Sequence, residues 1–161
     1  MMSFVIVLIA VLNLLAASTF ARDDNLPIIP GAHGFGMETP AGSGRHLPEP
    51  ETRVLKVTNL NDKGPGSLRA ALAAEGPRVV VFEVSGYIDL ESGLSISNPY
   101  ITVAGQTAPW PGIVIRGGYT MGVNTHDVLI QHIGFRTGDS IDGHYMPHRG
   151  GIQAGRSARN V

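Results

Sequence analysis

The sequence predicts an all-β protein of the parallel β-helix class, and three observations lead to that class. Residues 79–132 hold several short apolar, β-branched segments with no helix of ordinary length between them. The same region contains no tight Asn-Gly turn of the kind that hairpins favour. A polar turn followed by an apolar triplet also recurs along the chain. Parallel strands without intervening helices are accommodated chiefly by a coiled β-helix.

The first 21 residues have the pattern of a secretory signal peptide. Residues 4–17 are apolar except for Asn13, small residues stand at Thr19 and Ala21, and a polar stretch begins at Arg22. This pattern predicts cleavage after Ala21, a secreted protein and no stable membrane partner. The alternative is that the signal is not cleaved and anchors the protein in the membrane. The stretch is short for this role, because a span needs ~20 apolar residues. Residues 22–161 then form the β-helix portion.

One strand and one short helix are expected in the first half of that portion. Residues 54–58 (Val-Leu-Lys-Val-Thr) predict a strand. Ser67 is a good N-cap, and Gly76-Pro77 ends the helix that follows it. Because Leu68 and Leu72 share one face of this helix, we expect apolar residues to cover that face.

Six further strands are expected at residues 79–84, 87–90, 94–96, 100–104, 112–116 and 128–132. The segment 98–103 is similar to 126–130, since a polar turn precedes an apolar triplet in both. The same entry returns at Arg159-Asn160-Val161, so Val161 is expected to begin another strand. A coil that stopped there would leave unpaired backbone groups at an open edge.

Composition excludes several classes of protein. The chain has no cysteine, which rules out a disulfide scaffold, a zinc ribbon and thiol catalysis. Its formal net charge is −1 and only 16% of its residues are charged. A nucleic-acid partner is therefore not expected, because such proteins are clearly basic.

Five segments, in order along the chain, resemble the pectate lyase family of polysaccharide lyases. They are residues 30–40, 57–69, 77–86, 98–109 and 126–139, of which Val57-Thr-Asn-Leu-Asn-Asp-Lys-Gly-Pro-Gly-Ser-Leu-Arg69 is the most specific. The resemblance covers the N-terminal part of the family, from about Pro30 to Val161. It implies a right-handed parallel β-helix whose N-terminal end is capped by a short helix, a role that suits Ser67–Glu75.

The resemblance also implies an activity, a cofactor and a substrate. Enzymes of this family cleave pectate or polygalacturonate-type uronate polymers by Ca²⁺-dependent β-elimination outside the cell. Ca²⁺ bridges protein carboxylates and the substrate's uronate, which acidifies the C5 proton, and an arginine removes that proton. Oxygen-rich acidic sites are those that Ca²⁺ prefers. The implied partner is thus an acidic polysaccharide, and the complete protein is expected to be a monomer.

No catalytic residue is assigned within these 161 residues. In the family, an aspartate-histidine strand, further calcium carboxylates and the arginine base follow the Asn-Val that matches Asn160-Val161. The isolated chain is therefore expected to be an inactive fragment. The family tends to carry an aspartate before the Ile-Gln that matches Ile152-Gln153, and Gly150 stands in that place here. The alternative is a shifted carboxylate, for which Asp139 and Asp142 are the nearest candidates. The alternatives are a non-catalytic β-helix module that binds acidic glycans, and a chain without a stable fold.

Asp139 and Asp142 are the candidate metal ligands. They flank Ser140-Ile141 and precede Gly143, so ordinary turn aspartates are the alternative. Arg136 and Arg149 are the candidate substrate-binding residues, because cationic side chains attract an anionic polymer. Solvated surface arginines are the alternative for both.

Several other polar and aromatic residues are expected to have structural roles. Phe35 and Trp110 are expected to be packed aromatics, with stacking on sugar rings as the alternative. His126 and His132 are expected at turns or stacked between coils. Arg156 is expected to be a solvated surface residue, with attraction of the anionic polymer as the alternative.

Overall fold

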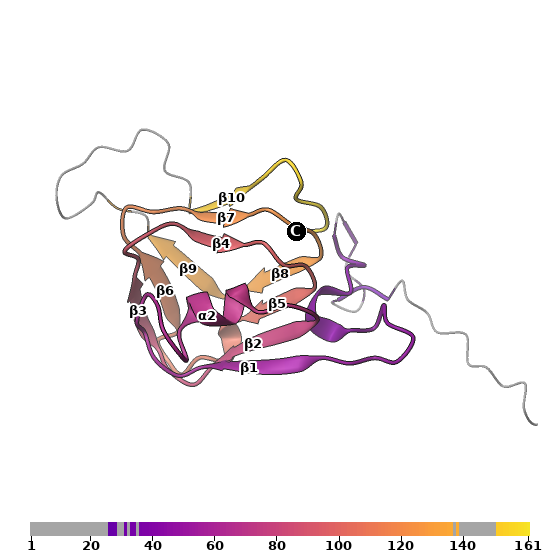
Figure 1. The fold of residues 1–161 in the computed structure, drawn as a ribbon, viewed down its shortest axis with the longest axis horizontal. Helices are drawn as coiled ribbons and strands as arrows, with labels where there is room; N and C mark the ends of the chain where they lie inside the picture. Colours follow the sequence, from indigo (N-terminus) through magenta and orange to yellow (C-terminus); the bar gives the residue numbers. More distant parts are fainter. Residues whose placement is uncertain (1–25, 29–30, 32, 35, 137, 139–150) are drawn as a thin grey trace, which may run out of the picture.

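A computed structural model describes residues 26–28, 31, 33–34, 36–136, 138 and 151–161. The expected signal peptide, residues 1–21, lies outside the described residues. The described part is a parallel β-helix whose strands form three sheets around a common core (Figure 1). Sheet A contains β1 (Arg53–Val57), β2 (Arg78–Phe82), β5 (Ile101–Ala104) and β8 (Val128–Gln131). Sheet B contains β3 (Gly86–Asp89), β6 (Ile113–Arg116) and β9 (Ile133–Arg136), and sheet C contains β4 (Leu94–Ile96), β7 (Met121–Val123) and β10 (Ile152–Ala154).

From β2 onward the chain visits the three sheets in a fixed order, so each of these turns of the coil contributes one strand to each sheet. β2, β3 and β4 form one turn, β5, β6 and β7 the next, and β8, β9 and β10 the one after. All strand pairs in the described part are parallel. The predicted β-helix class, inferred from missing hairpin turns and missing helices, is therefore confirmed.

The predicted repeat marks one corner of the coil. Ile101 lies opposite Val128 in the register of sheet A, which places segments 98–103 and 126–130 in adjacent turns. The Ile101 amide donates to the Asp127 carbonyl at 3.1 Å, and the Val128 amide donates to the Asn160 carbonyl at the same distance. The residues before each triplet, Tyr100, Asp127 and Asn160, have left-handed backbones with φ of 60°, 55° and 52°. The repeat is thus a repeated corner conformation.

Apolar side chains on alternate strand positions fill the inside of the coil. Along β2 the exposure alternates, with Arg78, Val80 and Phe82 buried and Val79 and Val81 half-buried. Strand residues point alternately to the two faces of a sheet, so a strand such as β2 supplies every second side chain to the core. The buried cluster consists of Val57, Leu68, Ala71, Leu72, Val80, Phe82, Ile88, Leu90, Leu94, Ile96, Ile101, Val103, Ile113, Ile115, Met121, Val123 and Val128.

The short helix α2 (Leu68–Ala73) closes the first turn of the coil, as the sequence predicts. The Ser67 hydroxyl caps it by accepting a hydrogen bond from the Ala70 amide at 3.3 Å. Leu68 and Leu72 are buried, and the helix packs against β4 and β1. Within the described ranges, no helix has the length and apolar character that a membrane span needs.

Arg78 holds the end of this helix in place from inside the protein. Its side chain is fully buried, and burial, with the nearby charge of Arg53, lowers the pKa of its guanidinium to about 10. It remains charged at neutral pH and donates to four backbone carbonyls at 2.9–3.1 Å, those of Leu72, Gly76, Asn98 and Pro99. These bonds connect the end of the helix to the loop that leads into β5.

Three strands were not predicted, and their composition explains why. β7 and β10 have only three residues each, and β7 and β9 each contain a glycine, which lowers strand propensity. The strand predicted at 128–132 ends one residue early, because His132 adopts a left-handed φ of 54° and forms the corner between β8 and β9. Histidine is among the residues enriched in that conformation.

Candidate functional site

The outer face of sheet B carries a row of charged residues at the ends of its strands. The register places Asp89 of β3 opposite Arg116 of β6, and Arg116 opposite Arg136 of β9. Adjacent strands lie about 4.8 Å apart, so these three residues are close neighbours on successive turns. Their inward-pointing neighbours Ile88 and Ile115 are buried in the core. The row therefore faces solvent on a rigid support.

Arg116 sits at the centre of this row and contacts residues of the preceding turn. Its Nη2 donates to Asp89 Oδ2 at 2.9 Å, and its Nε donates to Asp89 Oδ1. The guanidinium also lies over the ring of Tyr87, 4.4 Å from the ring centre. The hydrogen bond from Arg116 holds the pKa of Asp89 below its usual value, although burial opposes this shift. Arg116 is thus fixed in position by an acid and an aromatic ring.

Arg136, one of the predicted substrate-binding residues, occupies the last position of β9 and is exposed. Among the described residues it forms no ion pair, whereas Arg116 in the neighbouring strand is neutralised by Asp89. Two arginines and one aspartate give the row a net charge of +1. The structure thus places Arg136 where a dissolved anion can reach it.

The other predicted site residues lie outside the described residues. This is true of the metal candidates Asp139 and Asp142 and of the substrate-binding candidate Arg149. In the described part of the chain, no group of three or more histidine or acidic side chains is placed to hold a metal ion. The described residues therefore do not themselves form the calcium site that the resemblance implies.

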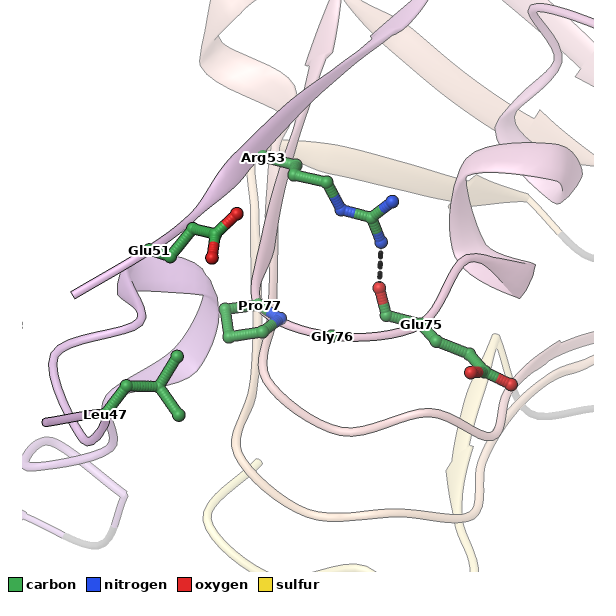
Figure 2. Close-up of a pocket in the computed structure, with 6 residues that line it drawn as sticks. All are labelled: Leu47, Glu51, Arg53, Glu75, Gly76 and Pro77. Carbon is green, nitrogen blue, oxygen red and sulfur yellow. Dashed lines mark hydrogen bonds between the residues drawn. The ribbon is translucent and has the colours of Figure 1, made fainter. Parts of the chain in front are cut away.

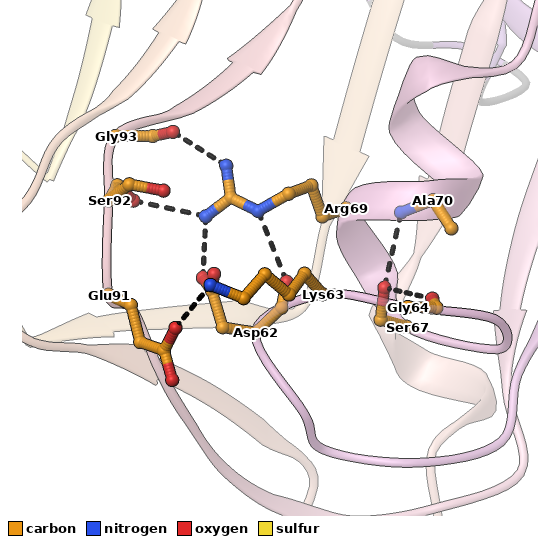
Figure 3. Close-up of polar contacts among 9 residues, drawn as sticks. All are labelled: Asp62, Lys63, Gly64, Ser67, Arg69, Ala70, Glu91, Ser92 and Gly93. Carbon is orange, nitrogen blue, oxygen red and sulfur yellow. Dashed lines mark hydrogen bonds and ion pairs between the residues drawn. The ribbon is translucent and has the colours of Figure 1, made fainter.

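An acidic hollow lies beside the start of the coil, between the loop before α2 and the segment after β3. It has a volume of about 420 Å³ and is lined by Leu60, Asn61, Asp62, Lys63, Asp89 and Glu91. Each of its three acids has a cationic partner, since Lys63 Nζ lies 2.7 Å from Glu91 Oε2, Arg69 Nη2 lies 2.5 Å from Asp62 Oδ1 (Figure 3), and Asp89 pairs with Arg116. The hollow therefore offers little free charge to a ligand.

The residues around this hollow explain the most specific sequence motif, 57–69. Arg69 donates to the Ser92 and Gly93 carbonyls at 3.1 and 2.7 Å, which binds the helix to the turn between β3 and β4 (Figure 3). Asn59 Nδ2 donates to the Pro65 carbonyl at 2.9 Å and closes the loop. The described contacts of the motif are thus those of a structural cap at the end of the coil.

A second hollow of about 380 Å³ lies where the N-terminal segment approaches the end of the helix (Figure 2). It is lined by Leu47, Glu51, Arg53, Glu75, Gly76 and Pro77, and Arg53 donates to the Glu75 carbonyl across it. Figure 2 draws one hydrogen bond between the lining residues, and it runs from the Arg53 side chain to the Glu75 backbone. It joins the start of β1 to the turn after α2.

The expectation that Trp110 is packed is wrong, because its side chain is 93% exposed. The Gly112 amide donates to the Pro109 carbonyl at 2.8 Å, so these residues close a tight turn. The central residues of such a turn project away from the strands, and aliphatic side chains already occupy the core. Phe35, the other aromatic predicted to pack, lies outside the described residues.

The histidine expectation is confirmed where the structure tests it. His126 meets the Tyr100 ring edge-on at 5.3 Å, and His46 stacks on the same ring at 3.7 Å. His132 forms the corner after β8. Arg156 is exposed in the turn after β10, as a surface arginine would be.

Sequence reasoning missed Arg116, the centre of the charged row, and the two residues that hold it, Tyr87 and Asp89. Tyr87 and Asp89 alternate with the core residue Ile88, and this period-two pattern could have assigned them to one outer face. Their pairing with Arg116 depends on the register between turns, and no pattern within one strand reveals it.

Comparison with known proteins gives one consistent result. No protein-family model matches the chain. A curated protein called probable pectate lyase C from Emericella nidulans is 41% identical over 109 residues, which is 68% of this chain and 24% of that protein. Proteins of the same description from Neosartorya fischeri and Aspergillus terreus are 39% and 38% identical over 113 and 109 residues. The chain spans about a quarter of the length of these relatives.

Proposed function

The chain is a pectate-lyase-like β-helix, and from that premise we propose that it forms part of a secreted polysaccharide lyase that cleaves pectate-type uronate polymers. The observation that carries the proposal is the identity of about 40% over two-thirds of the chain. The parallel coil and its capping helix also support it, because the segments that resemble the family form them. Cleavage by β-elimination is the reaction that the family resemblance suggests.

Arg136 would contribute binding of the substrate's carboxylates. It is exposed on a rigid strand and has no ion-pair partner among the described residues. A guanidinium donates two parallel hydrogen bonds to one carboxylate, which suits a uronate unit. Arg149 is proposed for the same role on sequence grounds.

Ca²⁺ is proposed as the cofactor of the whole protein, where it would acidify the proton that β-elimination removes. The described residues do not form a site for it, so the proposal for this chain rests on Asp139 and Asp142. Replacing both with asparagine and titrating Ca²⁺ calorimetrically tests their part. The unmodified chain should bind weakly, with a Kd on the order of 10⁻³ M, and the double variant should not bind. Equal binding by both would remove these two residues from the proposal.

Substrate binding is tested by electrophoresis of the 161-residue chain in gels that contain either polygalacturonate or neutral galactan. Only the acidic polymer should retard it. Arg136→Gln should weaken retardation about tenfold, as loss of a charge-assisted hydrogen bond worth about 1.5 kcal/mol would do. Lys56→Gln removes the same charge from sheet A, where Lys56 pairs with Glu83, and should have little effect. Equal weakening by both substitutions would assign the binding to general charge.

The 161-residue chain alone is expected to bind without releasing product, because it spans about a quarter of its relatives. Unsaturated uronate released from polygalacturonate absorbs ultraviolet light, so turnover is measured directly. Product formation by the chain alone would contradict this expectation. A non-catalytic module for acidic glycans is the alternative function, supported by Gly150 in the place of a family acid.

A further inference from the structure

Trp110 is the single tryptophan of the chain, and among the described residues it is the most exposed large apolar side chain. At 93% exposure, the indole has almost no contact with the rest of the described structure. Tryptophan is highly buried on average in folded proteins, and exposed tryptophan and tyrosine are enriched where proteins meet a partner. The fold gains nothing from an indole at this position.

Tyr87 provides a second exposed ring on the same side of the coil. It lies on β3 and is 53% exposed, with the Arg116 guanidinium 4.4 Å from its ring centre. Arg116 in turn is held by Asp89 through two hydrogen bonds. Ring and cation therefore keep a fixed mutual position before any ligand arrives, which lowers the entropic cost of binding.

Hydrogen bonds place Trp110 at the edge of this same sheet. The Ser85 hydroxyl, two residues before Tyr87, donates to the Trp110 carbonyl at 3.4 Å. The Gly86 amide donates to the Gly112 carbonyl at 2.8 Å. The turn that carries Trp110 is thus fixed to the beginning of β3, and both aromatic residues belong to the entry end of sheet B.

We propose that Trp110, Tyr87 and Arg116 form a sugar-binding face on sheet B that holds an acidic glycan along the outside of the coil. Aromatic rings bind the apolar faces of sugar rings, Arg116 fixes the Tyr87 ring, and Arg136 on the same sheet supplies the positive charge for uronate groups. The proposal rests on the proposed function, since it extends the binding of the same class of polymer beyond Arg136.

Charge favours an acidic occupant of this face. Its outward residues on the three strands are Tyr87, Asp89, Val114, Arg116, Gly134 and Arg136, with a net charge of +1. The whole chain carries a formal charge of −1, so sheet B differs in sign from the protein as a whole. A neutral sugar would use the rings and leave this positive charge without a function.

The single tryptophan makes the proposal directly measurable. Titration of the full 161-residue chain with an oligomer of galacturonic acid should shift the Trp110 emission and protect it from a soluble quencher. A neutral galactose oligomer should have much less effect. Trp110→Ala and Tyr87→Ala should each weaken binding in polygalacturonate gels about tenfold, which corresponds to ~1.4 kcal/mol. Tyr119→Ala, which removes an exposed ring from the turn after β6, serves as the matched control.

Folding is checked by circular dichroism and thermal melting, and each outcome of the titration decides something. If the chain binds the acidic polymer but both ring variants bind like the original and Trp110 emission is unchanged, the inference fails and the proposed function stands. If the chain binds no acidic polymer, both fail. An equal response to acidic and neutral oligomers would overturn the assignment to acidic glycans.

Discussion

Two buried polar residues, Arg78 and Asp127, connect parts of this chain that are distant in sequence. Arg78 donates hydrogen bonds to four carbonyls, which lie at the end of α2, in the turn after it and in the loop before β5. Asp127 accepts hydrogen bonds from Thr39 at 2.7 Å and from Asn160 at 3.2 Å, and so links the N-terminal segment to the entry of the last described coil. Both residues are buried, and both are structural.

Arg78→Met should destabilise the protein by about 3 kcal/mol, because it removes a buried donor that four backbone carbonyls share. Arg53→Met is the control, since Arg53 is exposed and donates to one carbonyl. Its cost should stay below about 1 kcal/mol. Urea denaturation followed by circular dichroism measures both free energies of unfolding. Similar losses for the two variants would show that the buried network contributes little.

Asp127 should make the free energy of unfolding depend on pH in the acid range. Burial opposes its ionisation, but hydrogen bonds from Thr39, His126 and Asn160 outweigh burial and hold the pKa of Asp127 below its usual value. A lowered pKa stabilises the fold above the unfolded value of about 3.9, and this contribution disappears as pH falls through the folded value.

Asp127→Asn should therefore be less stable than the original chain at about pH 6 and should lose less stability between about pH 5 and pH 2. Free energies of unfolding across that range measure the difference. The exposed Glu49→Gln variant should keep the original acid sensitivity. An Asp127→Asn variant with unchanged acid sensitivity would contradict this role.

The sequence was sufficient to name Arg136 as a candidate cation, but its exposed place at the end of β9 came from the structure, because that strand was not predicted. It was insufficient for the environment of Arg136. Tyr87, Asp89 and Arg116 come together only through the register between turns of the coil, which is set by the length of the intervening loops. The exposure of Trp110 likewise depends on its place in a turn outside the core.

At the scale of elements, short strands are defined by their neighbours more than by their own residues. The strand predicted at 94–96 matches β4, and the strand predicted at 100–104 begins one residue before β5, because apolar residues alternate or cluster there. β7 and β10, with three residues each, exist because the preceding turn offers backbone partners. Local propensity cannot reveal such strands, whereas the helix with its cap at Ser67 carries its own signals.

The short 3₁₀ helix η1 (Ala41–Ser43) illustrates how closely elements pack across the coil. Its Gly42 amide donates to Thr102 Oγ1 at 3.0 Å, and a Cβ on Gly42 would collide with the Arg78 carbonyl oxygen and the Thr102 amide. These neighbours are backbone atoms of β2 and β5, which cannot rotate away.

Gly42→Ala should therefore cost about 3 kcal/mol of stability, at the upper end of overpacking effects. Gly93→Ala is the matched control, because the nearest atom to its Cβ would be the Thr120 carbonyl oxygen at 4.0 Å. Thermal melting of both variants measures the contrast. A Gly42→Ala protein that melts with the original would show that η1 does not pack against the coil as described.

At the scale of the whole molecule, the fold and the family resemblance agree on one architecture. The described strands stack in parallel from β1 to β10, and at the corner before Asn160 the chain again pairs with the preceding turn through His126 and Arg159. Its class was predictable because parallel strands without helices leave few arrangements. The activity was not predictable from this physics, since it depends on residues that a stacking pattern does not specify.

The most direct measurement joins the 161-residue chain to the remainder of the Emericella nidulans relative, in place of that protein's homologous quarter. The relative itself is assayed in parallel. We expect the chimera to release unsaturated uronate from polygalacturonate, detected by ultraviolet absorbance, and to stop when Ca²⁺ is chelated. A chimera that melts cooperatively and binds the polymer, yet forms no product where the relative does, would contradict the assignment to a polysaccharide lyase.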